Sequence, residues 1–317
     1  MVESPRNGPV LIIAGPTASG KSALALELAT ELGGTVINAD ALQVSRDLRI
    51  LSARPDEAAE ARVPHRLYGI FDAAERGSAG RWREMAEAEI AAAQVAGRLA
   101  IVVGGTGLYL RILREGLAPV PDILPEIRDE AMSRYRALGG AAFRAELARF
   151  DPEAAERLPP ADRQRLIRAW EVVHATGVTL HDWQRRGQPV AARCFATILL
   201  MPPRDALYAA CNARLAGMIA RGGLEEAAAL TARCLPPTLP AMKAVGLPEL
   251  MRHLRGEMPL ADAVAAAQQA TRRYAKRQTT WFRHQMAADL IFAEQFSESL
   301  LRRSRHFIDD FLLTHPV

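Results

Sequence analysis

One segment of the sequence has the residue types and spacing of a loop that binds phosphate groups: Gly15-Pro16-Thr17-Ala18-Ser19-Gly20-Lys21-Ser22. It fits G-x-x-x-x-G-K-[ST] in full, directly after a short apolar run and directly before a helical pattern. In such a loop, backbone N–H groups and the start of the helix attract an anion, and Lys21 adds a full positive charge. Ser22 is placed to hold a magnesium ion. The pattern predicts that a phosphate or diphosphate binds here, and it leaves open whether that group is transferred, hydrolysed or released.

A carboxylate and a glycine-rich turn are expected beside this loop. Asp40 follows the apolar run 35–38, and the C-terminal ends of parallel strands meet at one edge of a sheet, where ligands bind. Asp40 is therefore a candidate metal ligand, cap of the next turn or general base. The run 99–103 leads into Gly104-Gly105-Thr106-Gly107, where a nucleotide hydrolase would have an acidic residue. That turn favours close approach of a substrate, with a plain strand-to-helix turn as the alternative.

Two basic stretches are candidates for contact with a polyanion. The segment 271–283 combines five basic residues with aromatic residues on a predicted helix. Arginines also recur in the middle of the chain, at Arg157, Arg163, Arg165, Arg168, Arg185 and Arg186. A salt-bridged, solvated surface is the alternative for each stretch taken alone.

The elements that must position these residues follow from the apolar runs. Runs at 10–14, 35–38, 67–71, 99–103, 194–201 and 289–292 predict strands, and helical patterns at 22–32 and 78–96 lie between them. This alternation predicts an α/β fold of three layers, with a parallel sheet around the phosphate-binding loop. Between these segments the pattern changes, and helices are expected at 125–138, 141–149 and 162–176. We therefore expect a core formed by residues 1–117 and 193–317, interrupted by a helical insertion at 118–192.

The composition is that of an ordinary globular protein. The 317 residues carry a formal net charge of +4, and 49% of them are hydrophobic. The three cysteines, Cys194, Cys211 and Cys234, have no spacing typical of zinc sites or disulfide frameworks. No run is long enough to cross a membrane and residues 1–9 have no apolar signal-peptide core, so a cytoplasmic location without membrane contact is expected. A monomer is expected because no heptad pattern is present.

The order and spacing of the motifs resemble those of the tRNA dimethylallyltransferase (tRNA isopentenyltransferase, IPP transferase) family over nearly the whole chain. The resemblance is carried by the phosphate-binding loop and by the segments 38–44, 52–55, 63–67, 103–109, 162–169 and 275–283. It is closest to the bacterial type, since the C-terminal zinc finger of some eukaryotic relatives is absent from the sequence.

The resemblance implies a P-loop NTPase-like core with an all-helical insertion, and a reaction in which dimethylallyl diphosphate alkylates N6 of adenosine-37 in tRNAs that read codons beginning with U. Asp40 would be the base and Thr17 would lie at the reacting centre, while the loop from Gly15 to Ser22 and Arg214 would bind the diphosphate with Mg²⁺. The insertion would bind the anticodon stem-loop of the tRNA. The positions implied for tRNA binding are Asp40, Ala41, Leu42, Gln43, Thr106, Arg128, Gln164, Arg165, Leu166, Ile167, Arg168, Met242 and Lys243.

Three positions depart from the pattern of the family. Ala41, Ser45 and Leu247 stand where serine, tyrosine and tyrosine are common, which would alter single hydrogen bonds to RNA rather than the reaction. Three other functions remain as alternatives: prenyl transfer to free adenine nucleotides, a P-loop kinase or nucleotide-binding switch, and a non-catalytic RNA-binding protein. The extended basic surface argues against the first, the Gly-Gly-Thr-Gly turn against the second, and Asp40 beside an intact loop against the third.

Overall fold

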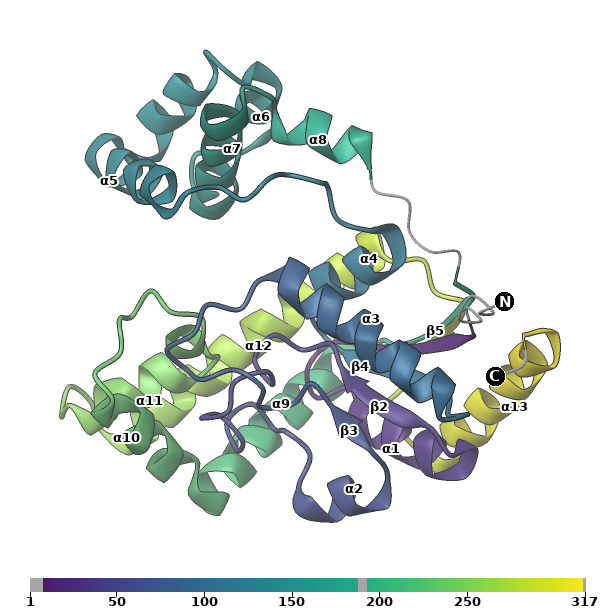
Figure 1. The fold of residues 1–317 in the computed structure, drawn as a ribbon. Helices are drawn as coiled ribbons and strands as arrows, with labels where there is room; N and C mark the ends of the chain where they lie inside the picture. The colour runs from purple at the N-terminus through teal and green to yellow at the C-terminus, as the bar shows by residue number, and fades with distance from the viewer. Residues whose placement is uncertain (1–7, 188–192, 316–317) are drawn as a thin grey trace. The chain divides into compact units, whose positions relative to one another are not determined.

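The computed structural model describes residues 8–187 and 193–315. The chain divides into two compact units, one formed by Met1–Arg114 with Ala191–Val317 and the other by Glu115–Val190 (Figure 1). In the described parts, no helix has both the length and the apolar character needed to cross a membrane.

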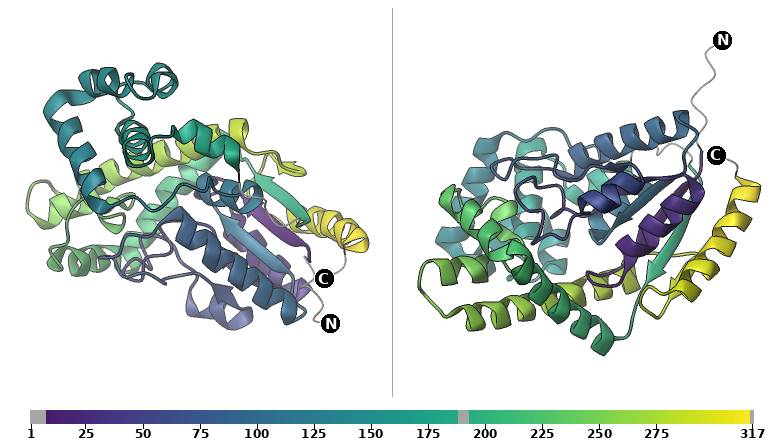
Figure 2. Two further views of the ribbon diagram at one scale, coloured as in Figure 1. Left: turned by 45° about the horizontal axis from the view of Figure 1, so that its top comes forward. Right: turned by 90° about the horizontal axis from the view of Figure 1, so that it is seen from below.

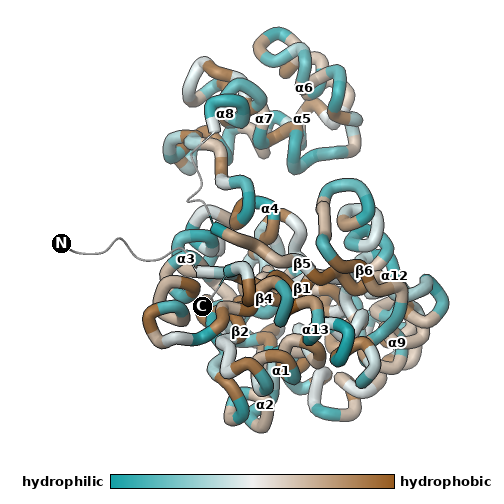
Figure 3. The backbone as a smooth tube through the Cα atoms, turned by 90° about the vertical axis from the view of Figure 1, so that its right-hand side faces the viewer, coloured by the Kyte–Doolittle hydropathy of each residue, from teal (hydrophilic) through white to brown (hydrophobic). Residues whose placement is uncertain are grey.

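The first unit is built on a six-stranded parallel sheet in the order β3-β2-β4-β1-β5-β6. The strands are β1 (Val10–Ala14), β2 (Thr35–Asn38), β3 (His65–Arg66), β4 (Ala100–Gly104), β5 (Phe195–Leu200) and β6 (Leu290–Phe292). β1 and β4 are completely buried, as expected of central strands whose two faces are covered by helices. Figure 3 shows these strands as a hydrophobic layer within the unit. The predicted α/β class is confirmed.

Alternate residues of β1 belong to two separate cores. Val10 and Ile12 pack with Trp82 of α3 (Ala79–Val95) and with residues of α4 (Gly107–Glu115). Leu11 and Ile13 point to the opposite face and pack with α1 (Lys21–Leu32) and α13 (Glu298–Thr314). The right-hand view in Figure 2 shows α1 and α13 side by side on that face. The sheet is thus the middle of three layers.

The remaining helices of this unit are α2, a short helix without buried residues, and a group of helices that pack on one another. They are α2 (Glu57–Arg62), α9 (Arg204–Met218), α10 (Leu224–Ala232), α11 (Leu247–Leu254) and α12 (Leu260–Gln285), with a π-helical segment at Ile219–Gly223 and a short 3₁₀ helix at Ala241–Lys243. α12 packs against α9 and α11. The apolar residues of α10, α11 and the 3₁₀ helix form a further core with Leu48 and Leu51 from the long connection after β2. This connection is thereby held against α10 and α11.

The described part of the second unit contains helices and loops but no strand. It contains α5 (Pro125–Leu147), α6 (Pro152–Arg157), α7 (Arg163–Thr176) and α8 (Leu180–Arg186), and its core is formed around Phe143, Leu166 and Trp170. α5 is broken at Gly139, whose φ of 73° is left-handed, so the two helices predicted at 125–138 and 141–149 are the two arms of one bent element. α7 ends at Gly177 in a left-handed cap, as the sequence predicted.

One predicted strand is wrong. Residues 67–71 do not form a strand, because β3 ends at Arg66 and Leu67 has a φ of 63°. Gly69 is also left-handed, with a φ of 60°, and no strand can continue through such residues. Only Phe71 retains strand-like pairing, in an isolated bridge to Ser45.

Candidate active site

The phosphate-binding loop lies at the centre of the sheet, between the end of β1 and the start of α1. A side chain at Gly15 would meet the carbonyl oxygen of Leu200 at 2.7 Å, and one at Gly20 would meet Phe296 at the same distance. Gly20 also has a φ of 92° and caps α1 without a side-chain hydrogen bond, which leaves the start of the helix open to an anion. The buried hydroxyl of Ser19 has no hydrogen-bond partner among the described residues. The fold therefore supplies the anion-binding loop that the motif predicted.

Lys21 is buried within this loop. Its side-chain nitrogen Nζ donates a hydrogen bond to the carbonyl oxygen of Pro16 at 3.2 Å. The pKa of Lys21 is lowered to about 8, mainly by burial and also by the charge of Arg214, and the carboxylate of Asp40 opposes this shift. A bound anion would stabilise the charged lysine and thus relieve the cost of its burial.

Asp40 is fixed by the residue two positions before it. The side chain of Asn38 accepts a hydrogen bond from the backbone N–H of Asp40 at 2.8 Å and donates to its carbonyl oxygen at 3.0 Å. The Oδ1 atom of Asp40 accepts from the N–H of Leu42 at 3.0 Å. The carboxylate thus caps the following turn, which was one of its three possible roles, and the cap uses one oxygen in this arrangement.

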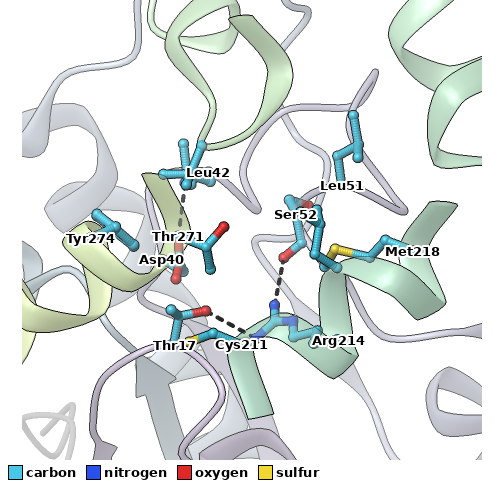
Figure 4. Close-up of a pocket in the computed structure, with 12 residues that line it drawn as sticks. Thr17, Asp40, Leu42, Leu51, Ser52, Cys211, Arg214, Met218, Thr271 and Tyr274 are labelled. Atoms are coloured by element: carbon cyan, nitrogen blue, oxygen red, sulfur yellow. Dashed lines mark hydrogen bonds between the residues drawn. The ribbon is translucent and has the colours of Figure 1, made fainter. Parts of the chain in front are cut away.

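Arg214 of α9 brings the loop together with the connection after β2. Its guanidinium donates to the hydroxyl of Thr17 at 3.0 Å and to the carbonyl oxygen of Ser52 at 3.4 Å. Burial lowers the pKa of Arg214, and the negative charge of Asp40 raises it. Thr17, Asp40 and Arg214 come from three distant parts of the sequence and line one cavity (Figure 4).

Polar and apolar side chains both line the cavity. Figure 4 shows Thr17 and Asp40 on one side, and Leu51 and Met218 on the other. The remaining lining residues are Leu42, Ser52, Cys211, Arg214, Leu215, Val245, Thr271 and Tyr274. Tyr274 lies on α12, and burial together with the charge of Asp40 strongly raises its pKa, so its hydroxyl stays protonated. Such a cavity suits a small ligand that has an anionic head and an apolar tail.

The glycines of the Gly-Gly-Thr-Gly turn make room for other parts of the chain. A Cβ atom at Gly104 would overlap the backbone of Ala39, and one at Gly107 would overlap the ring of Trp281. The hydroxyl of Thr106 accepts a hydrogen bond from the N–H of Ala41 at 2.9 Å. The space that the turn's glycines leave, which was expected for a substrate, is therefore occupied by the segments that carry Ala39 and Trp281. The turn holds these segments close together.

Two side chains hold the wall of the cavity, and only one of them was a sequence candidate. The side-chain amide of Gln43 donates to the carbonyl oxygens of Ser52 at 3.1 Å and Ala53 at 2.7 Å, so its polar group is engaged within the protein. The carboxylate of Glu226 on α10 accepts three backbone N–H groups, from Arg49 at 2.7 Å, Ile50 at 2.7 Å and Leu51 at 2.8 Å. Sequence reasoning missed Glu226 because no local pattern marks a partner that is more than 170 positions away.

The other candidates fall into distinct environments. Leu166, Ile167 and Met242 are buried and belong to hydrophobic cores. Lys243 is exposed, and Ala41 and Leu42 are partly exposed beside Asp40. Gln164 and Arg165 are exposed on α7 of the second unit. Ser22, the candidate metal ligand, is exposed in the first turn of α1.

Arg128 and Arg168 flank one buried carboxylate in the second unit. Glu171 has a side-chain exposure of 3% and lies 3.8 Å from the Arg128 guanidinium and 3.3 Å from that of Arg168. Both arginines remain about half exposed, at 54% and 42%. Glu171 therefore holds two accessible guanidinium groups next to each other on α5 and α7.

The sheet order, the loop after its central strand and the cavity define a phosphate-loop α/β protein that has a small, partly apolar ligand site. A sequence model of the family described as IPP transferase matches residues 43–285. The chain belongs to this family.

Named relatives agree with this assignment. The chain is 59% identical over 286 residues to a tRNA dimethylallyltransferase of Rhodospirillum centenum, covering 90% of this chain and 91% of the relative. It is 54% identical over 319 residues to that of Rhodospirillum rubrum, covering 98% and 97%. A solved tRNA isopentenylpyrophosphate transferase from Bacillus halodurans matches with a TM-score of 0.70 and 30% identity over 98% of both chains. A eukaryotic dimethylallyltransferase, at 23% identity and a TM-score of 0.82 over 98% of this chain and 81% of its own, has the same fold.

The buried Lys21 predicts how diphosphate binding depends on pH. The lysine begins to lose its proton near pH 8, whereas a bound anion keeps it charged, so binding above this pH must take up a proton. We expect the affinity for inorganic diphosphate, measured by calorimetry, to fall between pH 8 and pH 9 by up to about tenfold more than in the Lys21→Arg variant. Arginine stays protonated over this range.

The ionisation of diphosphate itself is common to both proteins and cancels in this comparison. The exposed Lys276→Arg variant serves as the control and should retain the pH dependence of the unsubstituted protein. Parallel curves for the unsubstituted protein and Lys21→Arg would contradict the assignment.

Proposed function

We propose that the protein transfers a dimethylallyl group from dimethylallyl diphosphate to N6 of adenosine-37 in tRNAs that read codons beginning with U. The observation that carries this proposal is one cavity lined by Thr17, Asp40 and Arg214 together with apolar residues that include Leu51 and Met218. A five-carbon tail suits the apolar lining residues, and a diphosphate suits the adjoining loop. The names of the relatives at 54% to 59% identity support the same reaction.

The reaction needs a base and a stabilised leaving group. The N6 nitrogen of adenine attacks the allylic carbon, the bond from this carbon to oxygen breaks, and diphosphate departs with the electron pair. Lys21, Arg214 and the N–H groups of the loop would stabilise the departing charge. Asp40 would accept the proton that N6 releases. The loop thus acts on a leaving group, and no phosphoryl group is transferred.

Mg²⁺ fits this site as an ion shared with the substrate. The described residues contain no cluster of His, Cys, Asp or Glu that could hold a metal by itself. Ser22 presents one exposed hydroxyl in the first turn of α1, and Mg²⁺ commonly takes few protein ligands together with phosphate oxygens and water. When bound, it would neutralise part of the charge of the diphosphate.

The partner would be the anticodon stem-loop of tRNA. While the target adenine is stacked in the tRNA, its N6 atom cannot reach the buried carboxylate of Asp40. The target nucleotide would therefore be turned out of the anticodon loop. Arg273, Lys276 and Arg277 are exposed on α12, next to Tyr274 of the cavity. Arg128 and Arg168 form the corresponding basic pair of the second unit. We further propose that the protein acts in the cytoplasm as a monomer.

The proposed acceptor is tested directly by product analysis. The purified protein is incubated with Mg²⁺, dimethylallyl diphosphate and either an unmodified tRNA that reads a U-initial codon or AMP, and the nucleosides are analysed by mass spectrometry. We expect dimethylallyladenosine from the tRNA alone. Prenylated AMP would assign the protein to free-nucleotide chemistry, and the absence of product from both acceptors would overturn prenyl transfer.

Loss of the proposed base should abolish turnover without loss of tRNA binding. Asp40→Asn keeps an oxygen for the N–H of Leu42 but cannot accept the proton, so we expect kcat to fall about 10²- to 10⁴-fold. The affinity for tRNA, measured by filter binding, should stay within about twofold because a single cap is preserved. Asp205→Asn, an exposed change at the start of α9, is the control. Normal turnover of Asp40→Asn would exclude Asp40 as the base.

The basic pair of the second unit should contribute to tRNA binding through phosphates. We expect Arg128→Gln with Arg168→Gln to weaken tRNA binding and to reduce the slope of log affinity against log salt by about 1 to 2. The KM for dimethylallyl diphosphate should not change. Arg157→Gln, an exposed change on α6, is the control. An unchanged salt slope would show that these arginines do not contact phosphates.

A further inference from the structure

Gln278 joins the phosphate-binding loop to the Gly-Gly-Thr-Gly turn. Its side-chain oxygen Oε1 accepts a hydrogen bond from the backbone N–H of Thr17 at 2.8 Å. Its Nε2 atom donates to the carbonyl oxygen of Gly105, also at 2.8 Å. Gln278 is 6% exposed and lies on α12, more than 170 positions from either partner. One buried amide thus ties together the segments that follow β1 and β4.

The fold leaves space at Gly105 for this amide alone. A Cβ atom at Gly105 would overlap Nε2 of Gln278, and its next neighbour would be the carbonyl oxygen of Gly15 at 3.2 Å. The missing side chain at Gly105 therefore permits the close approach of Gln278. The hydrogen bond from Gln278 therefore explains why a residue without a side chain stands at position 105.

The contacts of Gln278 continue from the phosphate-binding loop to the segment that carries Asp40. Thr106 follows Gly105, and its hydroxyl holds the N–H of Ala41, the residue after Asp40. Thr17, on the other arm of Gln278, also receives the hydrogen bond from Arg214. The chain of contacts therefore connects Thr17 and Arg214 with the segment that carries Asp40.

We propose that Gln278 is a positioning residue that sets the phosphate-binding loop at the correct distance from the Asp40 segment. Its side-chain amide is engaged with Thr17 and Gly105, and it acts through these two residues. This inference rests on the proposed prenyl transfer for its kinetic consequence, since an offset of about 1 Å between reacting groups can cost about 10²-fold in rate.

The consequence is a fall in kcat rather than in tRNA affinity. We expect Gln278→Ala to lower kcat about 10- to 100-fold and to weaken the binding of inorganic diphosphate, while the affinity for tRNA stays within about twofold. Gln268→Ala is the matched control, because Gln268 lies on the same helix and donates to the carbonyl oxygen of Asn212, outside the site. It should leave all three quantities unchanged.

A double-mutant cycle tests whether Gln278 acts through Gly105. Gly105→Ala should lower kcat in the unsubstituted protein because its methyl group displaces the amide. The Gln278→Ala variant lacks the amide that this methyl group would displace. The kcat of the double variant should therefore match that of Gln278→Ala within about twofold. Losses that multiply would show that the two residues act independently and would overturn the proposal.

Gln278→Glu provides a variant of the same size. Its ionised carboxylate still accepts from Thr17 but cannot donate to Gly105, whereas the protonated form restores a donor. The kcat of this variant relative to the unsubstituted protein should therefore rise as the pH falls below about 6, because burial raises the pKa of a carboxyl group. Lys21, Asp40, Arg214 and Tyr274 are present in both proteins and cancel in the ratio. A ratio that does not change with pH would count against the donor role.

The two proposals fail separately in these measurements. If the unsubstituted protein forms no dimethylallyladenosine, the proposed function is wrong, and the calorimetric affinity for inorganic diphosphate still decides the role of Gln278. If the product forms and Gln278→Ala retains both normal kcat and normal diphosphate affinity, the positioning role is wrong.

Discussion

The parallel register of β1 with its neighbours is the constraint on which the rest of the site depends. Ala14 pairs with Gly104, and Asn38 pairs with Val103, so β1, β2 and β4 end at the same level of the sheet. The loops that follow these strands must then converge, although they are far apart in the sequence. Every polar contact described between them is possible only because the buried strands cannot slip without exposing one of the two cores.

Electrostatics explains why this convergence favours an anion. Lys21 is buried and Arg214 is half-buried, and Asp40 is the carboxylate that opposes the lowering of both pKa values. The arrangement carries more positive than negative charge, and it remains unfavourable until an anion arrives. The burial of these positive charges costs free energy in the folded protein. Diphosphate binding is therefore more favourable by the part of this cost that it removes.

The sequence predicted those features that depend on neighbouring residues. β1 and β2 have the predicted bounds because apolar runs and glycines mark them locally. The strand predicted after His65 was wrong because the left-handed backbone of Leu67 follows from tertiary packing, not from residue type. For the same reason, the sequence indicated Asp40 and the phosphate-binding loop but not Glu226 or Gln278, whose partners are distant. Leu166, Ile167 and Met242 were selected by matching positions, and their apolar character marks them as core residues.

The hydrogen bonds between Glu226 and residues 49–51, which form part of the cavity wall, have an evolutionary consequence. Its carboxylate binds backbone N–H groups, which every residue except proline possesses, and it makes no use of the side chains at positions 49–51. The hydrogen bonds that fix the path of the wall are thus independent of side-chain type at these positions. Leu51 also packs in the core with α10 and α11, so a change at this position would alter the shape of the cavity while the three backbone hydrogen bonds to Glu226 could remain.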